Sequence, residues 1–231
     1  MQLTADIFFY ASPAGLDFSA EICSNTIIIK GRKLVVIDPG TKDRLGDLME
    51  RMSADGLNPS DIEYVILTHG HPDHLEAAPV LAEKFGTRLI ISRIEYEFIK
   101  ESAGVFFANY EFPAPEVIFE LEEEGYLNAS GLELRLLLTP GHSPGSLSVF
   151  WPEGRLLATG DLYFPGTIGA IDLLGGNPAD MYKSISRLRD LGGVEMVLCG
   201  HGPAIIDREM IIQNYRALFA EIAAKKAAGL M

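Results

Sequence analysis

The stretch that decides the fold of this chain reads Thr68-His69-Gly70-His71-Pro72-Asp73-His74. Three imidazoles and one carboxylate fall within six residues, between an apolar run typical of a buried strand and a segment with helical spacing. A loop this tight cannot give each imidazole its own hydrogen-bond partner, and protonated imidazoles side by side would repel one another. A divalent metal ion resolves this conflict because it accepts neutral imidazole nitrogens and carboxylate oxygens at about 2 Å.

The two remaining histidines of the chain occupy similar positions. His142 and His201 each follow an apolar run and lie beside glycine, so all five histidines are placed at or just after predicted strand ends, and four of them adjoin glycine or proline. A single histidine of this kind could be an ordinary buried polar group, but five of them predict a metal site. Asp161 ends the apolar run 155–159 in the same way. Five histidines and two aspartates suffice for two metal ions that share a bridging ligand.

The length and charge of the chain limit its class. Its 231 residues fit one domain, residues 1–231, built from two αβ halves of about 1–115 and 116–231. A net charge of -13 disfavours nucleic acid and anionic membranes as partners and leaves a small-molecule substrate as the expectation. The chain shows neither a secretory signal nor an apolar run of membrane-spanning length, and it has two cysteines. These features predict a cytoplasmic enzyme.

Hydrophobic periodicity predicts alternating strands and helices. In the first half, strands are expected at 25–30, 33–38, 62–67 and 88–91, and helices at 43–54 and 75–85. This order predicts a parallel or mixed sheet with helices on one face. In the second half, strands are expected at 117–119, 132–136, 146–151, 155–159 and 194–199, and helices at 178–190 and 207–227.

Two segments and two single residues each allow two interpretations. The irregular, aromatic-rich segment 93–115 could form a wall or lid over a substrate, with Phe106 and Phe107 as candidate substrate-binding residues, or the apolar face of a helix packed on the core. The terminal helix could pack on its own core or form a homodimer. Asp38 could accept hydrogen bonds from the histidine loop or serve only its Asp-Pro-Gly turn, and Cys199 could lie near the metals or act as a small buried hydrophobe.

Four motifs in order resemble those of the metallo-β-lactamase superfamily, and in detail its glyoxalase II-like hydrolases. They are His-x-His-x-Asp-His at 69–74, Pro140-Gly141-His142-Ser143-Pro144-Gly145-Ser146, Thr159-Gly160-Asp161 and Gly200-His201-Gly202. The resemblance covers about residues 24–203 and implies an α/β fold, the four-layer αβ/βα sandwich. It implies that one metal is bound by His69, His71 and His142, that the other is bound by Asp73, His74 and His201, and that Asp161 bridges them.

The resemblance also implies an activity. In such enzymes a hydroxide held between the metals attacks a carbonyl, and the metals stabilise the resulting oxyanion. We therefore expect a dinuclear hydrolase that opens a thioester or another activated carbonyl, with Asp73 as the candidate catalytic residue. Two divalent ions are expected, zinc first, with iron or manganese as alternatives. The segment 166–176 also resembles the glyoxalase II stretch after the bridging aspartate, but it has Ala170 where those enzymes commonly carry a basic residue that meets the glutathione carboxylate.

Three other functions stay open. Small lactonases share these motifs and bind substrate through a tyrosine near the bridging aspartate, for which Tyr163 is the candidate counterpart. Persulfide dioxygenases of this fold use a single iron held by two histidines and one aspartate. A non-catalytic module could keep the metals for folding and bind a partner through the aromatic segment. Structural zinc sites are closed and often rich in cysteine, so a ligand set without cysteine favours an enzyme.

Overall fold

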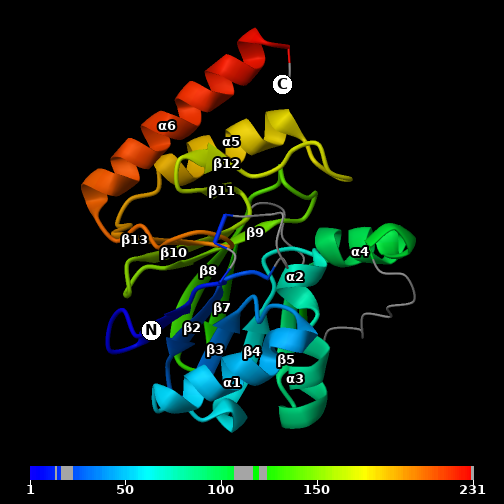
Figure 1. The fold of residues 1–231 in the computed structure, drawn as a ribbon, viewed down its shortest axis with the longest axis vertical. Helices are drawn as coiled ribbons and strands as arrows, with labels where there is room; N and C mark the ends of the chain where they lie inside the picture. The colour runs from blue at the N-terminus through cyan, green and yellow to red at the C-terminus, as the bar shows by residue number, and fades with distance from the viewer. Residues whose placement is uncertain (14, 17–22, 107–116, 120–123, 230–231) are drawn as a thin grey trace.

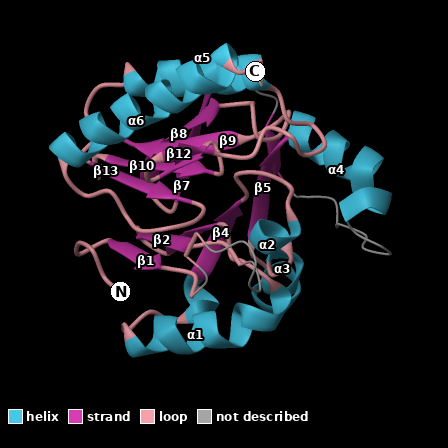
Figure 2. Ribbon diagram, turned by 45° about the horizontal axis from the view of Figure 1, so that its top comes forward, coloured by secondary structure: helices cyan, strands magenta, loops and turns pink. Residues whose placement is uncertain are grey.

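Two β-sheets lie face to face at the centre of the molecule, each with helices on its outer side (Figures 1 and 2). The structure is a computed structural model that describes residues 1–13, 15–16, 23–106, 117–119 and 124–229, with the side chains of 103–106 and 117–119 excepted. The helices α1 and α3 cover the first sheet, and α5 and α6 cover the second. The predicted α/β fold, a four-layer αβ/βα sandwich, is confirmed.

The first sheet contains six strands in the order of the chain, β1-β2-β3-β4-β5-β6. β1 to β3 pair antiparallel, whereas β3 to β6 pair parallel. Their bounds are β1 Ile7–Tyr10, β2 Thr26–Lys30, β3 Leu34–Ile37, β4 Ile62–Ile66, β5 Arg88–Ser92 and β6 Val117–Phe119. Side chains of β3 alternate between the two faces, so Val35 and Ile37 fill the core between the sheets while Val36 packs under the helices. Burial on both faces explains the continuous apolar runs of these strands.

The helices of the first half follow the expected order with one break. Their bounds are η1 Lys42–Arg44, α1 Leu45–Ala54, η2 Pro59–Asp61, α2 Pro72–Leu75, α3 Ala78–Phe85 and α4 Arg93–Phe106. The single helix expected over 75–85 is instead split between α2 and α3, because Pro79 lacks the N–H that a continuous helix would need in that turn and instead begins α3. Gly86, at φ 68°, ends α3 in the left-handed conformation that glycine tolerates.

The described part of the aromatic segment is a helix. α4 packs against β5 and β6, and its Ile99 is buried in the core beneath the first sheet. Of the interpretations left open for 93–115, packing on the core is therefore correct for the part of α4 whose side chains are described, which ends at Ser102. Phe106 is the last residue of α4 and its side chain is not among those described, and Phe107 lies outside the described residues.

The second sheet has the order β13-β10-β9-β8-β7, and a short hairpin follows β10. The bounds are β7 Glu124–Ala129, β8 Leu132–Leu138, β9 Leu147–Trp151, β10 Leu156–Gly160, β11 Tyr163–Phe164, β12 Thr167–Ile168 and β13 Met196–Cys199. α5 (Pro178–Arg189) and α6 (Arg208–Ala227) cover its outer face. Ile211, Tyr215 and Leu218 of α6 are buried there, which confirms packing of the terminal helix on its own core. No helix in the described part of the chain combines the length and apolarity that a membrane crossing requires.

Candidate metal centre

The predicted ligands come together where the two sheets meet at one edge. His69 and His71 follow β4, His142 follows β8, Asp161 follows β10 and His201 follows β13. Asp73 and His74 belong to α2, directly after the histidine loop. Three sets have ligand atoms within 4.8 Å of one another: His69, His71 and His142; His69, His74 and Asp161; and Asp73, His74 and His201. All seven predicted residues thus lie in one cluster.

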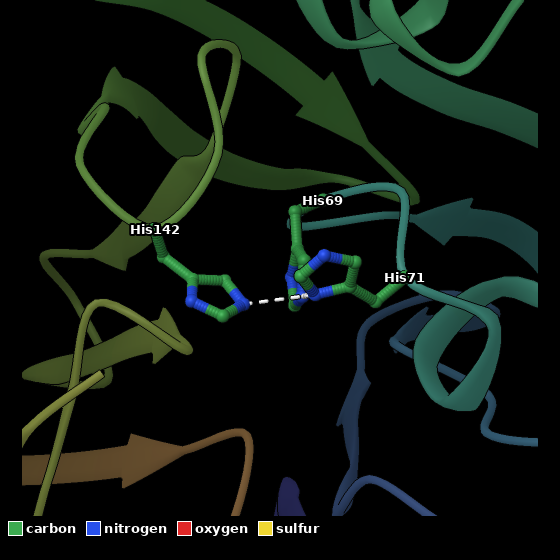
Figure 3. A group of neighbouring side chains, drawn as sticks. All are labelled: His69, His71 and His142. Carbon is green, nitrogen blue, oxygen red and sulfur yellow. Dashed lines mark hydrogen bonds between the residues drawn. The ribbon is translucent and has the colours of Figure 1, made fainter. Parts of the chain in front are cut away.

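The first set consists of three imidazoles with nitrogens aimed at one another (Figure 3). Nδ1 of His71 lies 3.0 Å from Nε2 of His69 and 2.9 Å from Nε2 of His142. His142 approaches from the loop after β8, opposite the two histidines of the loop after β4. Converging nitrogens of this kind are the geometry expected of ligands around a shared cation.

The remaining ligands, Asp73, His74 and His201, lie around Asp161. Nε2 of His201 lies 3.1 Å from Oδ2 of Asp73 and 3.4 Å from Oδ2 of Asp161. Nε2 of His74 lies 3.3 Å from Oδ1 of Asp161, and the other carboxylate oxygen of Asp161 lies 3.8 Å from Nε2 of His142. Asp161 therefore faces histidines of both sets, which is the position the bridging assignment requires.

Hydrogen bonds behind the rings determine which nitrogen carries the proton. Nδ1 of His142 faces the carbonyl oxygen of Ala170 at 2.8 Å, and a carbonyl can only accept. Nδ1 of His74 faces Oδ2 of Asp38 at 2.8 Å in the same way. Both rings therefore donate from Nδ1, so in the neutral form of each ring, the form that binds a metal ion, the lone pair is on Nε2, which faces the centre.

Asp38 orients a second histidine through Thr68. The Thr68 hydroxyl donates to Oδ2 of Asp38 at 2.6 Å, so it must accept from Nδ1 of His69, 3.0 Å away. Nε2 of His69 is then unprotonated as well. Oδ1 of Asp38 also accepts the backbone N–H of Thr68 at 2.8 Å. Of the two interpretations of Asp38, the role as acceptor for the histidine loop is the correct one.

Burial and neighbouring charges separate the histidines into two electrostatic groups. Burial lowers the pKa of His69 well below its ordinary value and, with His142 close by, lowers that of His71 to about 4. Burial also acts to lower the pKa of His201, but Asp161 and Asp73 outweigh it and raise the pKa to about 9. Burial acts to raise the pKa of Asp161, yet His74 and His201 hold it well below its ordinary value. One side of the centre thus offers neutral imidazoles and the other a set of charged pairs.

The residues present fit two divalent cations. Among the described residues, the buried atoms Nε2 of His74 and Oδ1 of Asp161 have no hydrogen-bond partner, although they face each other. Buried polar atoms are rarely left without a partner, and a metal ion satisfies both. Cys199 does not take part: it is fully buried in the core of the second half, and burial raises the pKa of its thiol to about 12. The interpretation of Cys199 as a small buried hydrophobe is correct.

A cavity of about 440 Å³ opens beside these ligands. Its metal-side wall is formed by His71, Asp73, His142, Asp161 and His201, and its other wall by Phe164, Thr167, Ile168, Ala170 and Leu173. Asp73 is the most exposed of the ligands that form ion pairs here, with 17% of its side chain accessible.

Tyr163 does not line this cavity. Its side chain points into the core of the second half, where its hydroxyl lies 3.1 Å from that of Tyr215. The expectation that Tyr163 binds substrate is therefore corrected: strand alternation in the short hairpin turns Tyr163 inward and Phe164 toward the cavity. The sequence analysis did not predict Phe164, Ile168 and Leu173 as cavity-lining residues. The signal that could have identified them is their apolar character within a few residues of the predicted ligand Asp161.

Comparison with known proteins agrees with this geometry. A family model for the metallo-beta-lactamase superfamily matches residues 20–201. The chain belongs to the metallo-beta-lactamase superfamily. Relatives in this superfamily include "Probable metallo-hydrolase YqgX" of Bacillus subtilis (strain 168), 32% identical over 76% of this chain and 83% of the relative. "Hydroxyacylglutathione hydrolase GloC" of Haemophilus influenzae (strain ATCC 51907 / DSM 11121 / KW20 / Rd) is 30% identical over 74% of this chain and 81% of the relative.

Solved structures of the superfamily share the fold. The family protein TTHA1429 from Thermus thermophilus superposes with a TM-score of 0.76 at 23% identity, over 98% of this chain and 82% of that one. TTHA1623, solved in a di-iron-bound form, superposes with a TM-score of 0.67 at 28% identity, over 88% of this chain and 98% of that one. Metallo-beta-lactamase superfamily proteins bind divalent metals, and the histidine and aspartate clusters of this chain are placed to do so.

Proposed function

We propose that this protein is a dinuclear metal-dependent hydrolase that opens a thioester or another activated carbonyl of a small molecule. The observation that carries the proposal is the convergence of seven buried or half-buried ligands in three overlapping groups beside an open cavity, with Asp161 facing His74, His201 and His142. Two divalent ions bound there would supply a hydroxide nucleophile near neutral pH and polarise the carbonyl under attack. The names of the relatives, one a probable metallo-hydrolase and the other a hydroxyacylglutathione hydrolase, support this reaction class.

The residues of the chain have distinct roles in this proposal. His69, His71 and His142 hold one ion, Asp73, His74 and His201 hold the other, and Asp161 contributes to both. Zinc is the first candidate metal, and iron or manganese are alternatives. The di-iron-bound form of TTHA1623 supports iron as a realistic alternative for a relative of this chain.

Asp73 is the proposed catalytic residue. It lines the cavity and is more exposed than Asp161, so a bound substrate can reach its carboxylate. The carboxylate can take a proton from the attacking water and return it to the departing thiolate or alkoxide. Burial acts to raise the pKa of Asp73, but His74 and His201, the latter 3.1 Å away, outweigh it and hold that pKa below its ordinary value.

The proposal is tested by turnover. The metal-loaded protein, the chelator-treated protein and the variants Asp73→Ala and His142→Ala are assayed against a panel of thioesters, lactones and phosphoesters. Hydrolysis that requires metal and is lost in both variants supports the proposal. The proposed function would be refuted if the metal-loaded protein hydrolysed none of these compounds, or if it consumed oxygen with a persulfide.

A further inference from the structure

The cavity beside the metal centre has a wall without charge. Phe164 and Ile168 come from the β11–β12 hairpin, and Ala170 and Leu173 come from the loop that follows. Thr167 is the polar member of this wall, and it is uncharged. Leu173 has 45% of its surface exposed, so it forms the rim at which a substrate enters.

None of the 19 lysines and arginines of the chain lines this cavity. The stretches outside the described residues contain neither lysine nor arginine, so they cannot add a cationic side chain to it. From 162 to 176 the one charged residue is Asp172, which is negative. Proteins anchor carboxylate and phosphate groups chiefly with arginine or lysine, and this cavity offers no such anchor apart from the metals.

We infer that the cavity accepts an uncharged, apolar substrate group, and that the enzyme discriminates against esters and thioesters whose leaving group carries a carboxylate. This inference rests on the proposed function and narrows its substrate class. Apolar surface from the substrate is removed from water against Phe164, Ile168 and Leu173, which favours binding in proportion to the area buried. An anionic group at the same place would lose hydration without gaining a partner charge.

A matched pair of substrates tests the inference. One acyl group is joined to two thiols, neutral N-acetylcysteamine and anionic 3-mercaptopropionate. We expect kcat/KM to be at least about tenfold higher for the neutral thioester, which corresponds to roughly 1.4 kcal/mol. Equal or better turnover of the anionic thioester would overturn the inference and leave the proposed function intact. Hydrolysis of neither thioester by a protein that turns over another compound of the panel would overturn the inference alone, and failure on the whole panel would overturn both.

A variant pair at Ala170 sharpens the test. The side chain at this position is exposed at the cavity wall, and only the backbone carbonyl contacts His142. Ala170→Arg should raise kcat/KM for the anionic thioester relative to the neutral one by about fivefold, the effect of one exposed charge pair. Ala170→Gln, with a longer side chain but no charge, should leave that ratio unchanged. An equal shift in both variants would show that size rather than charge sets the preference.

A second inference rests on a different observation, a fully buried carboxylate between the two histidine loops. Glu95, in the first turn of α4, accepts the backbone N–H of Gly70 with Oε1 at 2.8 Å. Its Oε2 accepts the hydroxyl of Ser143 and the backbone N–H of Gly145, each at 2.8 Å. Gly70 separates His69 from His71, and Ser143 follows His142. One carboxylate therefore connects both loops that supply the first set of histidines.

Two glycines of the motifs make this contact possible. A Cβ atom at Gly70 would overlap the side chain of Ile99, and one at Gly145 would overlap the backbone nitrogen of Glu95. Neither glycine has a positive φ, so space rather than backbone conformation requires glycine here. Ser92 completes the junction because its hydroxyl donates to the carbonyl of Gly145 at 2.6 Å.

We propose that Glu95 is a positioning residue that sets the distance between His142 and the pair His69 and His71. Groups that orient metal ligands typically change metal affinity by about 10–100-fold when they are replaced. Glu95→Gln keeps the shape of the side chain but replaces one acceptor oxygen with a donor amide that faces N–H or O–H groups. This variant should bind one of its two metal ions about 10–100-fold more weakly.

The test measures metal affinity by competition with a chelator, using zinc, and the absorption spectrum of the cobalt(II)-loaded protein. Ser102→Ala is the matched control, since Ser102 lies on the same helix and its hydroxyl bonds to the carbonyl of Phe98, away from both loops. Weakened binding of one ion in Glu95→Gln, with both ions bound normally in Ser102→Ala, is the expected result. Normal affinity for both ions with only a lower Tm would reduce Glu95 to a structural contact and overturn the inference.

A milder variant keeps the inference testable where Glu95→Gln does not fold. Ser143→Ala removes one of the two donors to Oε2 and leaves the Glu95 carboxylate and its bond to Gly70 in place. This variant should bind the same metal ion several-fold more weakly. Unchanged affinity for both ions in Ser143→Ala would contradict the positioning role.

Discussion

Replacing Asp38 with asparagine should loosen the metal centre without breaking the fold. The Asp38 carboxylate is 2% exposed and accepts three hydrogen bonds, from the backbone and hydroxyl of Thr68 and from Nδ1 of His74. Asparagine keeps the side-chain shape and tolerates the φ of 51° at this position. Its amide nitrogen is a donor, however, so in either orientation at least one of the three donors faces another donor.

The cost follows from that mismatch. A hydrogen bond to a charged group contributes about 1.5–3 kcal/mol, so Asp38→Asn should lower the unfolding free energy of the metal-free protein by about 2 kcal/mol. Asp38→Ala leaves all three donors without an acceptor and places a Cβ-bearing residue without a polar side chain at positive φ, so its loss should be about 4 kcal/mol or more. The exposed Asp43→Asn is the control and should change stability by less than about 0.5 kcal/mol.

Urea unfolding of the metal-free protein and chelator competition of the loaded protein measure the two consequences. Because Asp38 directs the lone pairs of both His69 and His74 toward the centre, Asp38→Asn should also weaken metal binding by about tenfold or more. An asparagine variant as stable as the unmodified chain, with unchanged metal affinity, would refute the reasoning that Asp38 orients these rings.

Three further predictions concern pH, packing and thiol reactivity. The metal-free protein should be most stable near pH 6.5. The pKa of His71 is lowered to about 4, so protonation of this ring destabilises the fold as pH falls from 6.5 toward 4, whereas the pKa of His201 is raised to about 9, so its stabilising effect is lost as pH rises from 6.5 through 9. Tm measured from pH 4 to 10 checks both slopes. Gly145→Ala should cost about 2 kcal/mol or more because its Cβ meets backbone, whereas Gly46→Ala, in open space within α1, should gain about 0.5–1 kcal/mol in urea unfolding. Cys199, buried and with its thiol pKa raised to about 12, should resist iodoacetamide at pH 8 until the chain unfolds, as peptide mapping would show.

The metal ligands were predictable because the chain places them in local, repeated contexts. Each lies at or shortly after the end of an apolar run, all but His74 adjoin glycine or proline, and strands that share a sheet bring their ends to one edge. The resemblance carried by the same motifs implied the paired sheets, and packing of α6 on its own core was one of two alternatives. Where burial was complete, as in β3 and β4, the apolar runs identified strands directly.

Contacts between distant segments were not predictable. Asp38 and Thr68 are 30 residues apart, and the Asp-Pro-Gly turn left open whether the carboxylate meets the histidine loop or serves only the turn. Glu95 was not predicted as part of the site because its hydrogen-bond partners lie 25 to 50 residues away in the sequence, and the aromatic residues around it indicated a substrate wall or a core helix instead. Strand β7 was missed because it is a partly exposed strand without a continuous apolar run, in which Tyr126 has 74% of its surface accessible.

The measurement that tests the central claim most directly is the ratio of bound metal to protein chain, by elemental analysis of the protein as purified and of Asp73→Ala and His142→Ala. His142 groups with His69 and His71, whereas Asp73 groups with His74 and His201, so under the proposed assignment each variant should lose one ion and keep the other. Two ions per chain, falling toward one in each variant, is the predicted result. One ion per chain that is unchanged in Asp73→Ala would contradict a dinuclear centre.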